Sequence, residues 1–179
     1  AKYIDLGHGR ALSLGGELRL RWERFDNPGF GRDRQDRDGY GLARGLFHGQ
    51  LYWNDRLSFF GQLESSEVSG RRAGPRANDR NALDVNQLFV QWTPYRSADD
   101  QIALRFGRQE VELGASQFTS AREGLNDRLS FDGVRLTGEV EGWRLHAMAA
   151  RVVPTRRGAF DDNSSPDETL SGFFVARSH

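Results

Sequence analysis

Six arginines recur on one side of segments in which polar and apolar residues alternate. They are Arg19, Arg21, Arg44, Arg105, Arg135 and Arg144. Successive side chains of a β-strand point to opposite faces, so this spacing places the guanidinium groups opposite the apolar side of each strand. A guanidinium group binds carboxylates in bidentate geometry and is weakly hydrated. A row of such groups is suited to weak, repeated contacts with an acidic solute.

The same polar faces carry acidic residues, which leaves a second interpretation open. These residues are Glu17, Glu23, Glu64 and Glu139. Arginine and glutamate on neighbouring strands can pair and stiffen a sheet without binding any solute. For any single arginine taken alone, we slightly favour this pairing.

The segment 11–25 shows the alternation most clearly. Leu18 and Trp22 fall on one face, and Glu17 and Arg19 fall on the other. About eight such segments follow one another without a convincing helix between them. The predicted strands span residues 11–25, 40–53, 57–64, 83–92, 101–113, 129–140, 143–153 and 169–177.

The connections between these segments alternate between long and short. Short turns joined to long loops in this way are typical of a transmembrane β-barrel. Trp53, Trp92 and Trp143 lie beside the shorter turns and Trp22 lies near the opposite end of its strand, as expected for aromatic belts. We therefore predict an all-β, antiparallel, up-and-down transmembrane barrel. The leucines predicted to face lipid are Leu14, Leu18, Leu20, Leu104, Leu136 and Leu145.

One predicted strand contains an irregularity. Leu83 and Val85 are out of phase with Leu88, Val90 and Trp92 in the same segment. An extra residue in a strand shifts all later side chains to the other face. The sequence therefore predicts either a β-bulge in this segment or a later start of the strand.

Composition is compatible with a barrel and argues against several other classes. Apolar residues make up 37% of the chain, and the mean hydropathy is −0.68, because only every second residue of a barrel strand faces lipid. No run approaches the ~20 apolar residues of a membrane helix. A formal net charge of zero argues against nucleic-acid binding. The absence of cysteine excludes disulfides, thiolate metal sites and cysteine nucleophiles.

The segment 102–153 carries the most specific features of the chain. In order, these are Gly107-Arg108-Gln109, Arg122, Leu125-Asn126, Arg128, Ser130-Phe131-Asp132-Gly133, Arg135 and Gly142-Trp143-Arg144. In these features the chain resembles the alginate-export family of Gram-negative outer-membrane porins. The resemblance implies a bacterial outer-membrane location, contact with lipid and lipopolysaccharide, and possible periplasmic secretion partners. It also implies a barrel of about 18 strands, wide enough for an aqueous channel, that passes an anionic polysaccharide or small acidic solutes.

This resemblance decides how the arginines are interpreted as a group. It favours conduction along an arginine-lined lumen for the cluster as a whole. Eight strands are fewer than half of such a barrel, so we expect the chain to be the N-terminal part of a longer protein. The alternative is a small closed barrel that displays charged loops as a structural or adhesive surface, since an eight-stranded barrel is filled by its own side chains and does not conduct.

The third long connection, residues 114–128, is the expected site of selectivity. A loop folded into a wide porin often sets its constriction, and the family features concentrate here. Candidate selectivity residues are Arg108, Arg122, Glu123, Asn126, Arg128 and Asp132. With the strand arginines, the predicted substrate path comprises Arg105, Arg108, Arg122, Arg128, Asp132, Arg135 and Arg144. It is equally possible that Asp132 bonds to Arg108 or Arg128 and latches the loop to the wall.

Catalysis and cofactor binding have little support. Ser130, His146 and Asp132 could compose a nucleophilic triad on paper, but nothing beyond residue identity supports it. The four histidines lack metal-site spacing, so we expect no enzyme, no cofactor and no metal. Asp161-Asp162-Asn163 with Asp167-Glu168 could offer oxygen ligands to Ca²⁺, although a solvated acidic loop is the interpretation we favour.

Overall fold

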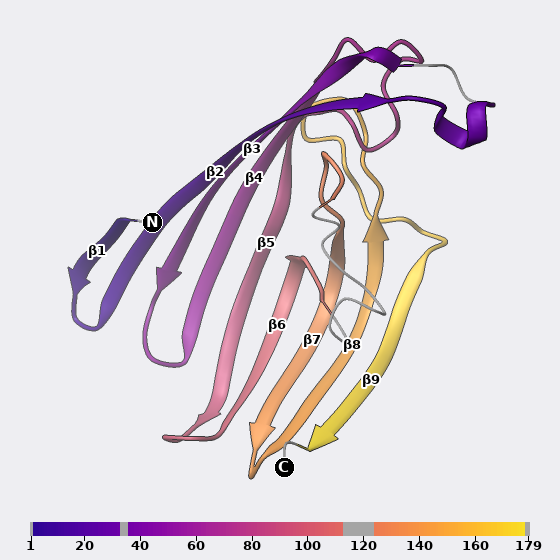
Figure 1. The fold of residues 1–179 in the computed structure, drawn as a ribbon. Helices are drawn as coiled ribbons and strands as arrows, with labels where there is room; N and C mark the ends of the chain where they lie inside the picture. Colours follow the sequence, from indigo (N-terminus) through magenta and orange to yellow (C-terminus); the bar gives the residue numbers. More distant parts are fainter. Residues whose placement is uncertain (1, 33–35, 113–123, 178–179) are drawn as a thin grey trace.

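The computed structural model describes residues 2–32, 36–112 and 124–177. These residues form one nine-stranded antiparallel sheet in which each strand pairs with its neighbours in chain order (Figure 1). The strands are β1 (Lys2–Gly7), β2 (Arg10–Phe25), β3 (Asp36–Tyr52), β4 (Leu57–Ser69), β5 (Asn81–Arg96), β6 (Gln101–Gln109), β7 (Ser130–Val140), β8 (Trp143–Val153) and β9 (Thr169–Arg177). One 3-10 turn, η1 (Pro28–Gly31), follows β2. The sheet is curved and, within the described residues, β1 does not pair with β9.

The connections separate the molecule into two ends, which we call the turn end and the loop end. Short connections at the turn end span residues 8–9, 53–56, 97–100 and 141–142, and longer ones at the loop end span 26–35, 70–80, 110–129 and 154–168 (Figure 1). The β7–β8 turn consists of Glu141 and Gly142, with φ angles of 51° and 76°. Two consecutive positive φ angles are the signature of a tight type I′ hairpin.

Several strands differ from the boundaries expected from sequence. β1 is absent from the predicted strands, because Lys2–Gly7 is too short to show a clear alternation, yet it forms a hairpin with β2. β4 continues past residue 64 to Ser69, since pairing with β3 persists after the apolar alternation ends at Leu63. β3 begins earlier and β5 ends later than predicted. β6 ends at Gln109, four residues before the predicted end.

The predicted bulge in the segment 83–92 is confirmed. Gln62 of β4 pairs with Gln87, but the next residue, Leu63, pairs with Val85. Asn86 is therefore the extra residue, and its side-chain amide donates a 2.8 Å hydrogen bond to Gln62 Oε1. The bulge returns Val85 to the face that also carries Leu88.

The two faces of the sheet are reversed relative to those of a soluble protein: apolar side chains are exposed on one face and polar side chains are buried on the other. The face we call convex carries exposed apolar side chains, and Leu18 and Leu20 are each 74% exposed. The opposite, concave face carries polar side chains that are buried, including Arg44 and Glu64. Contacts across the curve of the sheet lie on this concave side, where Arg19 of β2 donates to the Leu125 carbonyl oxygen. An apolar exterior with a polar interior matches a barrel wall in lipid.

The exposed apolar residues of the convex face extend over eight strands. They include Leu18, Leu20, Trp22, Phe47, Phe59, Leu63, Leu88, Trp92, Phe106, Val134, Trp143, Phe173 and Val175. All four tryptophans are at least 42% exposed, and three of them lie at the turn end. Among the described residues, no helix has the length and apolarity needed to cross a membrane.

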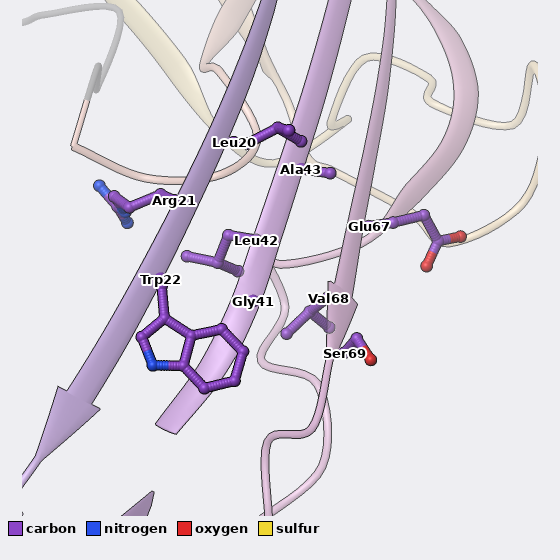
Figure 2. A pocket seen from close by; sticks show the side chains of 9 residues that line it. All are labelled: Leu20, Arg21, Trp22, Gly41, Leu42, Ala43, Glu67, Val68 and Ser69. Carbon is purple, nitrogen blue, oxygen red and sulfur yellow. The ribbon is translucent and has the colours of Figure 1, made fainter. Parts of the chain in front are cut away.

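Trp22 marks the loop end of the convex face. Its indole lies beside Gly41 in a groove of about 540 Å³ over β2, β3 and β4 (Figure 2). A β-carbon at Gly39 would lie 2.6 Å from the Trp22 Nε1 atom, and Gly39 has a φ of 77°. Glycine at this position is therefore required both by the backbone and by the close approach of the indole.

Part of the concave face is apolar. Val111, Phe131, Met148 and Ala150 form a buried cluster against β7 and β8. The cluster packs Val111, which follows β6, against the sheet. This contact fixes where the β6–β7 connection leaves the sheet.

Candidate functional site

The concave arginines lie in two groups. Strand register places Arg19 opposite Arg44 on β2 and β3, nearer the loop end, and Arg105 opposite Arg135 on β6 and β7. Arg144 lies on β8, near the turn end. The groups differ in what surrounds each guanidinium.

Glutamates pair with the arginines of β2 and β3. The Arg44 side chain is 1% exposed, and its Nη2 lies 2.9 Å from Glu17 Oε1. Arg21 lies 2.7 Å from Glu23, which also accepts a hydrogen bond from the Tyr40 hydroxyl. In this region the pairing interpretation of the arginines is correct.

Residues 124–128 of the β6–β7 connection lie on this same part of the concave face. Arg21 Nη1 donates a 2.8 Å hydrogen bond to the Gly124 carbonyl oxygen, and Arg19 donates to that of Leu125. The backbone N–H of Arg128 donates to Glu64 Oε1 at 3.2 Å. Residues that follow β6 are thus fastened to β2 and β4, strands distant from β6 in the sheet order, as expected for an inward-folded loop.

Arg108 joins the strands to a second connection. Its guanidinium donates to both carboxylate oxygens of Asp132, at 2.9 and 3.0 Å. It also donates to the carbonyl oxygens of Val85 and Asp162, each at 3.0 Å, and lies 3.7 Å from Asp84. The predicted bond between Asp132 and Arg108 is therefore present, but it joins neighbouring strands rather than the 114–128 loop to the wall. Arg128 instead binds Glu110 at 3.2 Å.

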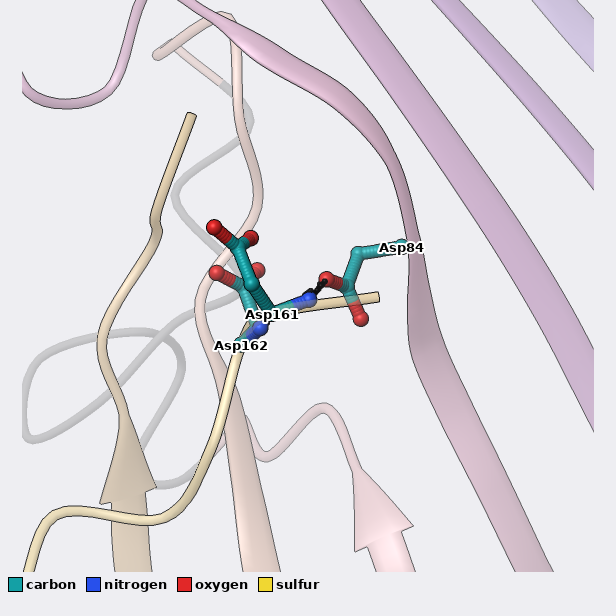
Figure 3. Close-up of side chains that lie close together, drawn as sticks. All are labelled: Asp84, Asp161 and Asp162. Atoms are coloured by element: carbon teal, nitrogen blue, oxygen red, sulfur yellow. Dashed lines mark hydrogen bonds between the residues drawn. The ribbon is translucent and has the colours of Figure 1, made fainter. Parts of the chain in front are cut away.

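Three aspartates meet beside Arg108. Asp161 and Asp162 of the β8–β9 connection donate their backbone N–H groups to Asp84 Oδ2, at 2.8 and 3.0 Å (Figure 3). Five of the six carboxylate oxygens accept N–H donors, the remaining donors being those of Val85, Gly158, Arg156 and Asn81. One oxygen from each of the three carboxylates lies within 4.8 Å of the others, and Arg108, 3.7 Å from Asp84, supplies a counter-charge to the cluster.

Burial alters the acidity of two loop carboxyl groups in this network. Burial raises the pKa of Asp162 to about 6, and the nearby carboxylates of Asp84 and Asp127 contribute to the rise, while the Arg156 N–H opposes it. Burial also raises the pKa of Asp127, against the effect of hydrogen bonds from Thr155, Asn81 and Ser66. Asp161 and Asp162 are thus half-buried and hydrogen-bonded, whereas Asn163, Asp167 and Glu168 of the same predicted acidic loop are exposed.

Arg105 and Arg135 have a different environment. Arg105 lies over the Phe89 ring, 3.9 Å from its centroid, and donates to Gln91 Oε1 at 2.8 Å. Phe89 stacks in turn on Phe60, with the ring centroids 5.1 Å apart. Arg135 Nη2 lies 3.5 Å from His146 Nδ1, and its buried Nε has no acceptor within the described part of the chain.

Acidic partners are absent from this second group. In the described ranges, neither Arg105 nor Arg135 forms an ion pair with a carboxylate, nor does Arg144, although Arg144 is opposite Glu139 in register. Adjacent like charges destabilise each other. Two neighbouring guanidinium groups offer donors of the kind that form charge-assisted hydrogen bonds with carboxylates.

The structure separates some of the predicted site residues and brings others together. Asp132 binds Arg108 and Ser164, and His146 contacts Arg135 and Phe174, so these two residues of the hypothetical triad are engaged elsewhere. Arg122 and Glu123 lie outside the described residues.

The sequence analysis did not identify the residues that hold the Arg105 side chain, Phe89 and Gln91. Strand alternation places Phe60, Phe89 and Gln91 on the polar face, and aromatic residues on that face were the available signal.

Comparison with known proteins gives one match. A family model described as alginate export matches residues 10–178. No curated protein and no solved structure matches the chain.

Proposed function

Because the chain belongs to the alginate export family, we propose that it forms part of the wall of a bacterial outer-membrane channel for an alginate-like polysaccharide or smaller acidic solutes. In this proposal the nine strands are a portion of a larger barrel of about 18 strands, wide enough for an aqueous lumen. The convex face contacts lipid and lipopolysaccharide, and the concave face lines the lumen. The short turns face the periplasm, where secretion partners would engage them.

The observation that carries this proposal is the pair of arginines on β6 and β7. Arg105 and Arg135 are direct cross-strand neighbours, and no carboxylate pairs with either of them within the described residues. Phe89 and Gln91 hold the Arg105 guanidinium in place. A sheet that needed these residues only for stability would gain from a glutamate at one of the two positions.

An acidic sugar residue would relieve the repulsion between the two guanidinium groups. Its carboxylate would lose part of its hydration and gain charge-assisted hydrogen bonds, which are stronger than neutral ones. Binding at several such sites, each of them weak, lets a chain enter and leave. Arg144 would extend the path toward the turn end.

The remaining residues of the predicted path have a different role in this proposal. Arg108, Arg128 and Asp132 are bound to other protein groups, so they would shape the lumen by holding the two long connections. Arg122 remains a path residue proposed from sequence alone.

The test is the ion preference of the full-length protein in planar bilayers. Replacing both arginines (Arg105→Gln with Arg135→Gln) should shift the reversal potential under a salt gradient toward lower anion preference. The shift should be larger at low salt, because the Debye length is ~30 Å at 0.01 M. The control is Arg80→Gln, since Arg80 is exposed and pairs with Glu67.

The same recordings distinguish this proposal from a structural or adhesive barrel. A barrel that only displays loops would give no solute-conducting channel. A channel whose anion preference is the same in the double variant as in the wild type would contradict the arginine path.

A further inference from the structure

We infer that Asn126 is a positioning residue, which pins residues 124–127, in the described part of the β6–β7 connection next to β7, to the concave face and so narrows the lumen at that place. This inference rests on the proposed channel function. Asn126 is 2% exposed. Its side-chain amide donates to three carbonyl oxygens: Ala43 on β3 at 3.1 Å, Glu67 on β4 at 3.0 Å, and Asp79 before β5 at 2.8 Å.

The residues on either side of Asn126 are fastened as well. Arg21 and Arg19 donate to the carbonyl oxygens of Gly124 and Leu125. Asp127 donates its N–H to the Asn78 carbonyl oxygen at 3.1 Å and accepts a hydrogen bond from Thr155. The connection is therefore tied to β2, β3 and the residues before β5, and Asn126 is at the centre of these contacts.

The chemistry of the contact requires a primary amide. Three carbonyl oxygens from separate segments converge on one nitrogen, and a carboxylate in its place would repel all of them. The Asn126 Oδ1 atom is buried and has no donor among the described residues. Burying an oxygen without a hydrogen-bond donor costs free energy. The hydrogen bonds made by the amide N–H groups must offset this cost.

Ser66 provides a way to observe the connection directly. It is 1% exposed, and its hydroxyl lies 3.4 Å from Asp127 Oδ1 on the concave face. The chain contains no cysteine. A Ser66→Cys variant of the full-length protein would therefore carry one thiol within this chain, on β4 beside Asp127. A polar thiol reagent would reach this thiol only when residues 124–127 detach from the concave face.

The experiment compares Asn126→Asp with a matched control, both in the Ser66→Cys background. The amide nitrogen has two N–H donors, which the three carbonyl oxygens share. Losing each donor should favour the released state by roughly fivefold, so thiol labelling should be faster by roughly 25-fold. The control is Asn163→Asp, because Asn163 is exposed and donates to one carbonyl oxygen in the other long connection. It should leave the labelling rate unchanged. If Asn126→Asp does not assemble, Asn126→Ser removes the same donors without adding a charge.

A second measurement tests the effect on transport. Single-channel conductance of the Asn126→Asp protein should rise, because the released connection no longer occupies the concave face, while Asn163→Asp should conduct as the wild type does. Unchanged labelling in the Asn126 variants would overturn the inference. Faster labelling with unchanged conductance would overturn the role in setting the lumen, and would leave the arginine path to be decided by the reversal potentials above.

Discussion

The arginines near the loop end and the group formed by Arg105, Arg135 and Arg144 have different roles in the sheet. Arg21, Arg44, Arg108 and Arg128 each contact a carboxylate, and Arg19 and Arg21 also hold the β6–β7 connection. Arg105, Arg135 and Arg144 have no ion pair within the described residues. A polar face of uniform composition thus contains a scaffold and a candidate binding surface.

The difference shows that residue type does not determine whether a lumenal arginine stabilises or binds. The presence of a carboxylate within reach does. Arg44 is opposite Arg19 in register but pairs with Glu17, whereas Arg105 is opposite Arg135 and neither contacts a carboxylate of the described residues. The pairing interpretation therefore describes one region, and the conduction interpretation remains the proposal for the other.

Removing one arginine from each region should give the sharpest contrast in stability. Arg108→Met leaves the carboxylates of Asp84 and Asp132 without their counter-charge and should cost roughly 3–5 kcal/mol of unfolding free energy, as expected for a broken buried ion pair. Arg135→Met removes a repulsion and should leave stability unchanged or increase it. Urea unfolding of the full-length protein in detergent measures both, and equal losses would erase the distinction between the two regions.

The assignment of the faces is tested next. Leu18 is 74% exposed on the convex face, and an arginine there should cost ~2–4 kcal/mol if the site is near the bilayer midplane. Leu18→Arg should therefore impair assembly, measured by heat-modifiable gel migration and recovery in membranes. The matched control is Leu18→Phe, which keeps the site apolar. Normal assembly of the Leu18→Arg protein would show that this face does not contact lipid.

Mild acid should strengthen the packing of the β8–β9 connection. The folded pKa of Asp162 is about 6, above the ordinary aspartate value of 3.8. The folded state therefore binds more protons between these values, and unfolding free energy should rise as the pH falls from about 6 toward about 4. The Asp162→Asn variant removes the titrating carboxyl group and should flatten this dependence in melting curves. If the Asp162→Asn variant keeps the wild-type dependence of unfolding free energy on pH, then ionisable groups other than Asp162 cause that dependence.

The smallest effect is expected for a pair outside both regions. The side chains of Arg80 and Glu67 are about half exposed, and their contact is 3.1 Å. Exposed pairs contribute roughly 0.2–1 kcal/mol, so Arg80→Gln should shift the unfolding midpoint only slightly. A loss as large as that for Arg108→Met would mean that this pair belongs to the scaffold.

The strand pattern of the chain is accessible to sequence reasoning because alternation is a local property. The bulge before Gln87 is visible as a phase error between Val85 and Leu88. β1 is not, since Lys2–Gly7 is only six residues long, with only Ile4 and Leu6 as an apolar pair on one face, and it depends on pairing with β2.

The long-range contacts of the site cannot be predicted from a local sequence pattern. The sequence marks Asn126 and Arg108 as unusual, but which backbone carbonyls Asn126 meets is decided by where the β6–β7 connection crosses the sheet. The division of the arginines likewise depends on which side chains reach each guanidinium group in the folded sheet, as when Arg44 pairs with Glu17 rather than with a residue directly opposite it.

The most direct test of the central claim, that Arg105 and Arg135 bind sugar carboxylates, is block of the channel current by an oligouronate. Full-length wild-type protein should show concentration-dependent interruptions with the acidic oligosaccharide and far fewer with its methyl-esterified, neutral form. In the Arg105→Gln, Arg135→Gln protein, block by the acidic form should weaken toward that of the neutral form. Equal block of wild type and double variant by the acidic form would contradict the account.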